Sequence, residues 1–429
     1  MSAVDVAVVG GGPAGAASAI FLARQGYAVT LLDRARFPRD KVCGEFISPA
    51  ADALLNEMGV LAAIEARRPL RLKGIFLAAH GERPLWVDYP PERPGGSPMS
   101  SLSVPRLDLD GLLLQRARAV GVQVREGFAV TDFRVRDGAA VGVAGKDDAG
   151  AGFEIAARLV IDAGGRNCLA IRRFGLRKKR GGKRGKIALA AHWRGGRRFA
   201  PYCYMHIQPP GYTGIAPTGE GEANVVLVVE GGALKGKDPE EFYRRTVLAE
   251  PSRRALLEGA APMEKVRAVD SLAYAVRTAP IGGLMLVGDA MGFMDPFTGE
   301  GIYLSLRSAK IAAEAAGQAL AGRVSSRQAI DEYRERRLRE FRWKFAISRV
   351  LEGLIERPAP CRWVMRALGA RPALAEDLVG VIGDYFPARK VASAGFLLRL
   401  LGVAAASAFA PAESGGTRPE KIPAGSPES

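Results

Sequence analysis

The sequence predicts a mixed α/β fold, in which a parallel-sheet domain carries an inserted, mainly antiparallel β-sheet domain and is followed by a C-terminal helical region. Three observations support this fold class: a glycine-rich turn between a strand and a helix at the N-terminus, a strand-rich middle part, and helical periodicity near the C-terminus. The chain has 429 residues, of which 48% are hydrophobic, so it is long enough for two or three domains with cores of their own.

The N-terminal segment has the pattern of a Rossmann-like βαβ unit. The apolar residues 6–9 form a strand that leads into Gly10, Gly12 and Gly15, which allow a tight turn, close approach of a pyrophosphate and tight helix packing, respectively. A second strand ends about twenty residues later at Asp33, whose carboxylate can accept hydrogen bonds from a ribose diol. Because a carboxylate disfavours a 2′-phosphate, the pattern predicts a bound dinucleotide other than NADP.

The helix of this unit begins near Pro13. Its unpaired backbone N–H groups and the positive end of its dipole point toward the pyrophosphate, so no lysine is needed there. We therefore add Pro13 and Ala14, in the first helical turn, and Arg34, directly after the acidic residue, to the predicted dinucleotide contacts.

The chain is strongly basic, with a formal net charge of +16. Such a charge is compatible with nucleic acid, an anionic membrane surface or an acidic partner. The densest basic cluster, residues 177–186, contains no aromatic side chain. Because nucleic acid strands bind on aromatic stacking platforms, we expect no nucleic acid partner.

The cysteines and histidines do not predict a metal site. Four cysteines lie far apart and only three histidines are present, without metal-ligand spacing. The N-terminus enters its first strand at once, without the pattern of a secretory signal. The most apolar late stretch, residues 392–410, is interrupted by Arg399 and is too short to span a bilayer. We therefore expect a cytoplasmic protein without a transmembrane helix.

Turn residues and periodicity divide the chain into segments. Alternating apolar runs at 128–143, 153–161 and 186–229 predict antiparallel strands, whereas 301–320 has the pattern of a long helix. The predicted segments are the dinucleotide-binding domain at 1–72, 101–170 and 278–325, substrate-domain strands at 73–100, the substrate β-sheet at 171–277, a helical region at 326–410, and a disordered tail at 411–429.

A second motif, VGDAMGFMDPFTGEGI, lies at residues 287–302. A buried strand delivers Asp289 to a loop, where its carboxylate can accept hydrogen bonds from sugar-chain hydroxyls. The turn at Gly299 and Gly301 permits close approach of the backbone to a planar ring, and the helix that follows directs its positive end at that ring. This arrangement would stabilise the anion that forms when a flavin is reduced.

Four motifs together resemble a known family. GGGPAG, RFPRDKVCGE, IDAGGR and GDAMGFMDPFTGEGI, in this order and spacing, resemble the FAD-dependent p-hydroxybenzoate hydroxylase superfamily. Within it, KVCGEFISP is similar to the geranylgeranyl reductase-like branch. The resemblance covers residues 4–320 and implies non-covalently bound FAD. Since no second glycine-rich fingerprint follows a strand, the electron donor is either NAD(P)H bound transiently in the open cleft or a reduced electron-carrier protein.

The resemblance assigns roles to residues of these motifs. Asp289 would bind the ribityl chain, Arg106 would lie near the FAD phosphates, and Gly299 and Gly301 would lie beside the pyrimidine edge of the isoalloxazine. The expected FAD contacts are Gly10, Gly12, Pro13, Ala14, Gly15, Asp33, Arg34, Cys43, Arg106, Asp289, Pro296, Gly299, Gly301 and Ile302.

The IDAGGR turn departs from the pattern of the hydroxylases. Asp162 and Arg166 match a DG turn that reaches the reduced nicotinamide, but Ala163 replaces the usual glycine. The resemblance therefore implies a nicotinamide-facing turn of altered composition.

Three residues are candidates for the chemistry. Cys43 matches a cysteine that the reductase branch carries near flavin and substrate; it would position a double bond or shuttle a proton, or else pack as a small buried residue. Glu45 is the nearest carboxylate for acid/base work, with a surface salt bridge as the alternative. Tyr212 lies in a segment that resembles the wall over the flavin, with the core or rim of the inserted sheet as the alternative.

Two reactions fit these motifs. Reduced flavin can deliver a hydride to the C=C bond of a prenyl or other hydrophobic substrate, or it can activate oxygen to hydroxylate a polyketide or aromatic metabolite. No histidine lies inside a flavin motif to deprotonate a phenol, which favours reduction. The tryptophan-rich signature of flavin halogenases is absent, so we do not expect halogenation.

A third alternative is a non-catalytic flavoprotein that binds a membrane or a partner. Residues 329–356 combine aromatic and basic side chains, which is typical of a helix that lies on anionic lipid headgroups. The same pattern fits a helix that covers the flavin domain with its arginines solvated. The first interpretation predicts peripheral association with the inner face of the membrane.

Overall fold

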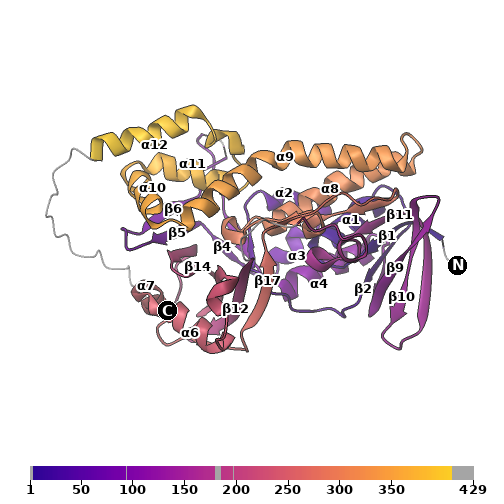
Figure 1. Ribbon diagram of the computed structural model, residues 1–429, viewed down its shortest axis with the longest axis horizontal. Helices are drawn as coiled ribbons and strands as arrows, with labels where there is room; N and C mark the ends of the chain where they lie inside the picture. The colour runs from indigo at the N-terminus through magenta and orange to yellow at the C-terminus, as the bar shows by residue number, and fades with distance from the viewer. Residues whose placement is uncertain (1–2, 93, 179–184, 197, 408–429) are drawn as a thin grey trace.

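The computed structural model describes residues 3–92, 94–178, 185–196 and 198–407, so the predicted tail at 411–429 lies outside the described residues. Figure 1 shows the nucleotide-binding sheet with its helices at the right, a second sheet at the lower left and the C-terminal helices above that sheet. The predicted fold class is confirmed by this arrangement.

The first sheet has the strand order β8-β2-β1-β11-β10-β9, with β19 paired to β11. β1, β2, β8, β11 and β19 are parallel, whereas β10 lies antiparallel between β11 and β9. The bounds are β1 Ala3–Val9, β2 Val29–Asp33, β8 Gln123–Glu126, β9 Phe128–Arg136, β10 Ala139–Asp147, β11 Gly152–Asp162 and β19 Leu284–Leu286. Because parallel strands end at one edge, Val9, Asp33, Asp162 and Leu286 lie near one another.

Helices α1 (Pro13–Ala23), α4 (Arg106–Ala119) and α8 (Gly301–Leu320) pack on this sheet. The first ten residues of α1 are all buried, because its alanines and glycine let α8 approach closely. α9 (Ser326–Ile355) begins with a capping box of Ser325 and Gln328 and covers α8. Its Phe341 is 1% exposed and Phe345 packs on the same core, whereas Trp343 is exposed, so only the two phenylalanines are directed into the protein.

The second sheet, here called the cap sheet, has the order β16-β12-β15-β14-β13-β5-β6, with β17 paired to β12. Its bounds are β5 Gly74–Ala79, β6 Leu85–Asp88, β12 Lys186–Arg194, β13 Tyr202–Gln208, β14 Gly211–Gly219, β15 Glu222–Glu230, β16 Ala261–Pro262 and β17 Arg267–Leu272. Side chains alternate across β13: Cys203, Met205 and Ile207 join the core shared with the C-terminal helices, whereas Tyr202 and Tyr204 face the opposite side.

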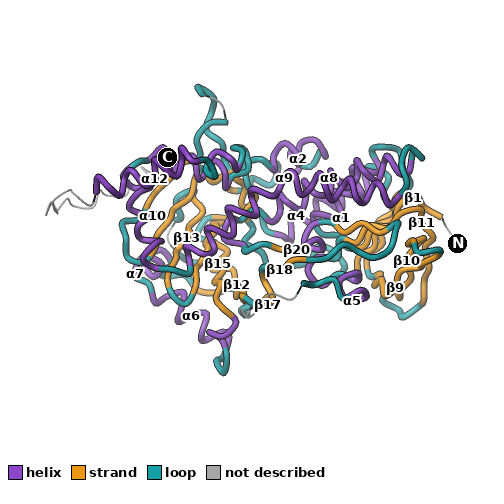
Figure 2. The backbone as a smooth tube through the Cα atoms, turned by 45° about the horizontal axis from the view of Figure 1, so that its top comes forward, coloured by secondary structure: helices purple, strands orange, loops and turns teal. Residues whose placement is uncertain are grey.

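The C-terminal region consists of α10 (Pro358–Ala370), α11 (Pro372–Ile382) and α12 (Ala394–Ser407). Proline occupies the first position of α10 and α11, where its missing N–H is not needed. Figure 2 shows these helices beside the strands of the cap sheet, at the end of the molecule opposite the N-terminus. None of the helices in the described ranges combines the length and apolar character that crossing a bilayer requires.

Shorter elements connect these layers. They are α2 Ala51–Met58, α3 Leu61–Glu65, α5 Leu169–Phe174, α6 Pro239–Ala249, α7 Pro251–Leu256, β3 Phe46–Ile47, β4 Leu70–Leu72, β7 Ser101–Ser103, β18 Tyr274–Ala275 and β20 Gly292–Phe293. β3, β7 and β4 form a small sheet, and β18 pairs with β20.

Candidate functional site

A cavity of about 620 Å³ lies where the nucleotide-binding sheet, the cap sheet and the C-terminal helices meet. One part of its wall is polar and belongs to the two glycine motifs; the other part is apolar and belongs to the cap sheet and to α10 and α11. Of the predicted site residues, the following line it: Pro13, Asp33, Arg34, Cys43, Arg106, Tyr212, Asp289, Pro296, Gly299, Gly301 and Ile302.

The first glycine motif is interlocked by backbone contacts. A Cβ on Gly15 would lie 1.8 Å from the carbonyl oxygen of Gly10, and a Cβ on Gly10 would lie 2.6 Å from that of Ala163. Gly10, Ala14 and Gly15 do not line the cavity. Their role is to pack α1 against the sheet, which brings the start of the helix to the cavity wall at Pro13.

The start of α1 is open to a ligand. Gly12 is the N-cap and offers no side-chain hydrogen bond to the first turn, and a Cβ on it would meet only the guanidinium tips of Arg39 and Arg106, at 3.6 and 3.9 Å. Asp33 accepts hydrogen bonds from the backbone N–H groups of Gly11 and Ala35, at 2.6 and 2.8 Å. A carboxylate held in this way keeps lone pairs for a ribose diol.

Basic side chains surround this helix start. The guanidinium of Arg106 donates two hydrogen bonds to Asp110, at 2.9 and 2.7 Å, and Arg39 lies 3.1 Å from the same carboxylate. Lys41 also lines the cavity. Desolvation raises the pKa of Asp289. The positive charges of Lys41, Arg106 and Arg166 lower it and so oppose this shift. This cationic wall suits a diphosphate.

The second glycine motif forms the opposite side of this part of the cavity. Gly299 has a φ of 70°, and a Cβ there would lie 2.6 Å from the ring of Phe46. A Cβ on Gly301 would meet nothing within 4 Å, so the backbone at the start of α8 is accessible from the cavity. An open helix start beside a diphosphate-binding wall fits the flavin end of FAD.

The turn before α8 is held by buried charges. The Glu300 carboxylate, which is 4% exposed, accepts hydrogen bonds from Thr298, at 2.9 Å, and from Lys344 of α9, at 2.7 Å. Lys344 also pairs with Asp384, which follows α11 and accepts a hydrogen bond from Ser48 at 2.7 Å. Desolvation raises the pKa of Asp384, and Lys344 opposes this shift. These contacts connect the flavin turn to the C-terminal helices.

The loop that carries Cys43 is fixed at both of its ends. The backbone N–H of Glu45 donates to Sγ of Cys43 at 3.4 Å, and Nδ2 of Asn224 donates to the Cys43 carbonyl at 2.6 Å. Glu45 is 2% exposed; it accepts from the backbone N–H of Arg106 at 2.9 Å and pairs with His192 at 2.8 Å. The alternative of a surface salt bridge is therefore wrong, because the carboxylate is buried, and Glu45 does not line the cavity.

Tyr212 belongs to a buried hydrogen-bond network. Its hydroxyl donates to Asp295 at 2.6 Å, and Lys186 donates to the other oxygen of Asp295 at 2.7 Å. Phe297, which follows Asp295, packs edge-to-face on the Tyr212 ring with centroids 5.2 Å apart. Desolvation and Asp295 raise the pKa of Tyr212 well above its usual value, so its hydroxyl stays protonated and links the cap sheet to the flavin turn.

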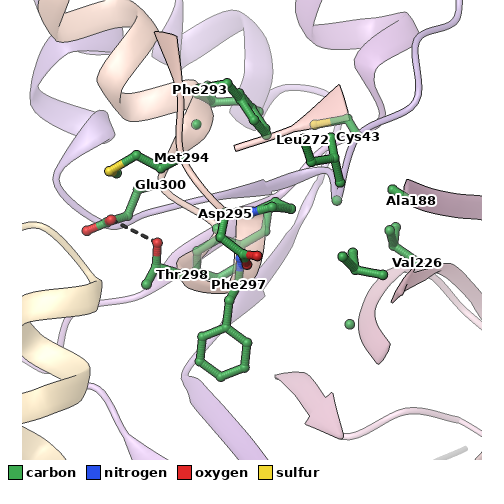
Figure 3. A pocket seen from close by; sticks show the side chains of 18 of the residues that line it. Cys43, Ala188, Val226, Leu272, Phe293, Met294, Asp295, Phe297, Thr298 and Glu300 are labelled. Carbon is green, nitrogen blue, oxygen red and sulfur yellow. Dashed lines mark hydrogen bonds between the residues drawn. The ribbon is translucent and has the colours of Figure 1, made fainter. Parts of the chain in front are cut away.

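The apolar part of the cavity lies next to this network. Figure 3 shows Ala188 and Val226 of the cap sheet at one side and Asp295, Phe297 and Thr298 of the flavin turn at the other. The further apolar lining consists of Ile75, Leu77, Val87, Met205, Ile207, Val228, Leu354, Ile355, Val364, Met365, Leu368, Ala375, Leu378, Val379 and Ile382. The apolar lining therefore extends the cavity from the flavin turn to the cap sheet and the C-terminal helices.

Asp162 is not part of this cavity. It is fully buried, and its oxygens accept from the backbone N–H groups of Gly164 and Ala170, at 3.0 and 2.8 Å. The implied role in reaching a nicotinamide is therefore wrong for Asp162, because its carboxylate stabilises the turn and the start of α5. Arg166 does line the cavity and donates to the carbonyl oxygen of Asp270.

Several residues of the site were not predicted from the sequence. Arg39, Lys41 and Asp295 line the cavity, and His192 and Lys186 hold its walls. Asp295 directly precedes the predicted Pro296, so the motif itself contained a signal for it. The apolar wall from α10 and α11 had no such signal, because helical periodicity does not identify the surface that a helix contacts.

Comparison with known proteins shows the family of this chain. A family model described as an FAD binding domain matches residues 3–345. A tryptophan 2-halogenase of Chondromyces crocatus is 29% identical over 373 residues, which are 82% of this chain and 68% of that protein. A menaquinone reductase of Mycolicibacterium smegmatis is 30% identical over 323 residues, which are 72% of this chain and 75% of that protein.

Two solved structures share the fold of this chain. The myxobacterial chondrochloren halogenase, an FAD-dependent enzyme, is 25% identical with a TM-score of 0.72, over 80% of this chain and 83% of that one. A geranylgeranyl bacteriochlorophyll reductase-like protein of Thermoplasma acidophilum shares the fold, with a TM-score of 0.71 and 23% identity, over 94% of this chain and 96% of that one.

Proposed function

Because the chain belongs to the FAD binding domain family, we propose that it is an FAD-dependent oxidoreductase that reduces a C=C bond in a prenyl-type or other hydrophobic chain. The family membership supports FAD as the cofactor and an oxidoreductase as the class of enzyme. The substrate and the reaction rest on the shape and chemistry of the cavity.

The observation that carries the proposal is the apolar wall of the cavity. It continues from the flavin turn at Asp295 and Phe297 to α10 and α11 and consists almost entirely of Leu, Ile, Val, Met and Ala. A chain that offers no hydrogen bonds is stabilised in such a site by burial of its CH₂ and CH₃ groups, at roughly 25 cal/mol per Å² of apolar area. The menaquinone reductase among the relatives takes its name from a quinone that carries such a chain.

The residues of the chain can prepare an alkene for reduction. FAD, when bound and reduced, supplies a hydride. Cys43 lines the cavity, and its Sγ accepts a hydrogen bond from Glu45 N–H. The S–H proton is therefore not donated to Glu45, and we assign it to the second carbon of the alkene. Tyr212, held by Asp295, closes the site toward the cap sheet and keeps water out. Hydride and proton together saturate the double bond.

An oxygen-dependent reaction is the second candidate, since halogenases are among the similar proteins. Hydroxylation of a phenol needs a base close to the reacting ring. Among the described residues that line the cavity there is no histidine, and His192 is turned to Glu45 and Glu264. This distribution favours reduction over hydroxylation.

Anaerobic turnover tests the proposal. The purified FAD-loaded protein is reduced with dithionite and mixed, without oxygen, with a quinone that carries a polyprenyl chain; the product is analysed by mass spectrometry. Air oxidation before the mass analysis returns any quinol, which dithionite also forms directly, to the quinone. We then expect a product that is heavier by one hydrogen molecule, with both hydrogens in the prenyl chain by fragmentation, and no such product without the protein. Parallel reactions with NADPH, NADH or a reduced ferredoxin identify the electron donor.

The Cys43→Ala variant tests whether Cys43 is the proton donor. Cys203→Ala is its control, because Cys203 also lines the cavity. We expect Cys43→Ala to reduce turnover by about 10²-fold, as for loss of a general acid, with unchanged flavin absorbance, and Cys203→Ala to stay active. Product formation only in the presence of oxygen, with an inserted oxygen or halogen atom, would replace the proposal by the second candidate.

A further inference from the structure

α12 exposes an apolar surface that the rest of the described chain leaves uncovered. Leu397, Leu398 and Leu401 are 50%, 67% and 57% exposed. They lie at i, i+1 and i+4, on one side of the helix. Phe396 and Leu400, on the other side, pack into the core that α10, α11 and the cap sheet share. α12 therefore has apolar residues both toward the protein and away from it, and an apolar helix surface of this kind normally has a partner.

The surroundings of this surface are basic. Residues 357–402 contain seven arginines and lysines and three acidic residues. Arg389 is exposed, and the side chains of Arg366 and Arg399 are 68% and 51% exposed. Glu82 and Asp377 pair with Arg366 and Arg399 respectively, and the excess of positive charge remains. Exposed leucines in a region with an excess of basic side chains are typical of a helix that binds at an anionic lipid surface.

We propose that α12 docks on an anionic lipid bilayer, with Leu397, Leu398 and Leu401 inserted at the boundary between headgroups and acyl chains. Two observations favour lipid over a second copy of the chain. The excess positive charge of residues 357–402 would repel the same region of another copy, whereas anionic headgroups attract it. α12 also packs on α10, whose Val364, Met365 and Leu368 line the apolar part of the cavity. Docking at α12 brings the bilayer within one helix layer of the cavity.

This surface differs from the one that the sequence suggested. The aromatic residues Phe341 and Phe345 of α9 are packed against α8 and the core beneath it. Three other apolar side chains of α9, Leu338, Trp343 and Val350, are exposed. They provide a control with the same number of exposed apolar residues on another helix.

Vesicle sedimentation tests the proposal on the full-length, FAD-loaded protein. Wild-type protein should pellet with vesicles that contain phosphatidylglycerol and should bind much more weakly to pure phosphatidylcholine vesicles. The variant L397S/L398S/L401S should lose about tenfold or more in partition coefficient, because three leucines no longer enter the bilayer. The control L338S/W343S/V350S should bind like wild type. Flavin absorbance and melting temperature establish that both variants are folded.

Three outcomes would overturn the inference. Wild-type protein that stays in the supernatant with anionic vesicles excludes the docking. If the α9 control variant no longer binds vesicles and the α12 variant binds like wild type, the lipid-binding helix is α9. A dimer of the wild type that the α12 variant converts to a monomer shows that a second copy covers the surface. The docking does not depend on the proposed reaction. The two are separated by a turnover assay of the α12 variant with a detergent-solubilised substrate: activity there, without vesicle binding, shows that the loss concerns docking and not the reaction.

Discussion

Glu45 joins three separate segments of the chain through one carboxylate. Its backbone φ is 56°, and its side chain reaches the start of α4 at Arg106 and the cap sheet at His192. His192 in turn contacts Glu264 at 2.8 Å through its other ring nitrogen. The hydrogen bond that His192 donates to Glu45 is the main cause that raises the pKa of His192 to about 9. The ring is therefore a cation at neutral pH and donates from both nitrogens.

The stability of the protein should therefore depend on the charge of His192. Because its pKa is about 9 in the folded protein and 6.5 ordinarily, the protonated ring adds stability that is fully present below pH 6.5 and is lost as the pH rises through 9. We expect His192→Gln to lower the free energy of unfolding by up to about 3 kcal/mol near pH 6, and by much less near pH 10. Urea unfolding at both pH values measures the difference.

His80→Asn is the control for this prediction. His80 has a φ of 47°, which asparagine tolerates. Desolvation lowers the pKa of His80, so its charge does not change above neutral pH. The effect of this substitution should be equal at pH 7 and pH 10; a His192→Gln effect that is likewise independent of pH would show that the Glu45–His192 pair is not charged.

At the level of elements, α9 is the connection between the flavin turn and the C-terminal helices. Lys344 of α9, with its side chain 10% exposed, lies between the carboxylates of Glu300 and Asp384. Both carboxylates are buried, and each comes from a different part of the chain. The ammonium group is thus a structural cation at the start of α8, beside the expected position of the flavin.

Removal of this cation should be costly. Lys344→Met leaves two buried carboxylates without their partner, so we expect a loss of about 3–5 kcal/mol in unfolding free energy and weaker retention of FAD. Lys310→Met is the control, because Lys310 makes a more exposed pair with Glu57 of α2 at 2.7 Å, which is worth at most about 1 kcal/mol. Chemical unfolding and flavin absorbance after gel filtration measure both effects. Equal losses for the two variants would contradict the proposed role of α9.

At the level of the whole molecule, the cavity exists only where three parts of the chain meet. The nucleotide-binding sheet places the glycine motifs, the cap sheet supplies one apolar wall, and α10 and α11 supply another. These parts are separated by long stretches of sequence, and each one by itself presents an ordinary amphipathic surface. The cavity of about 620 Å³ is a property of their assembly.

Filling the apolar part should affect the substrate and leave FAD in place. Ala188 of β12 is 5% exposed and lines the cavity opposite the flavin turn. We expect Ala188→Phe to raise the Kd for a polyprenyl quinone by about tenfold or more, because the ring occupies the space of several CH₂ groups. Titration of the flavin spectrum with the quinone measures the Kd. Ala321→Phe, at the exposed end of α8, is the control, and equal affinity of the two variants would place the substrate elsewhere.

Much of the fold was accessible from sequence patterns, because local periodicity reports local structure. The predicted long helix at 301–320 coincides with α8, and the alternating runs at 128–143 and 153–161 fall within β9, β10 and β11. The role of Asp162 was wrong, since an aspartate after a strand can cap the next helix as readily as it can face a ligand. The surface location of Glu45 was wrong as well, because its partner His192 lies in another domain segment.

The glycine spacing, the acidic strand end and the second motif determined by themselves that this chain forms a dinucleotide-binding βαβ unit, because each of these features acts within a few residues of backbone. Only the tertiary structure decided what surrounds the flavin turn: the Tyr212–Asp295–Lys186 network, the Lys344 cluster and the apolar wall of α10 and α11. The physical reason is that burial, pairing of charges and cavity shape depend on contacts between segments far apart in the chain, and no local pattern encodes which surfaces will meet.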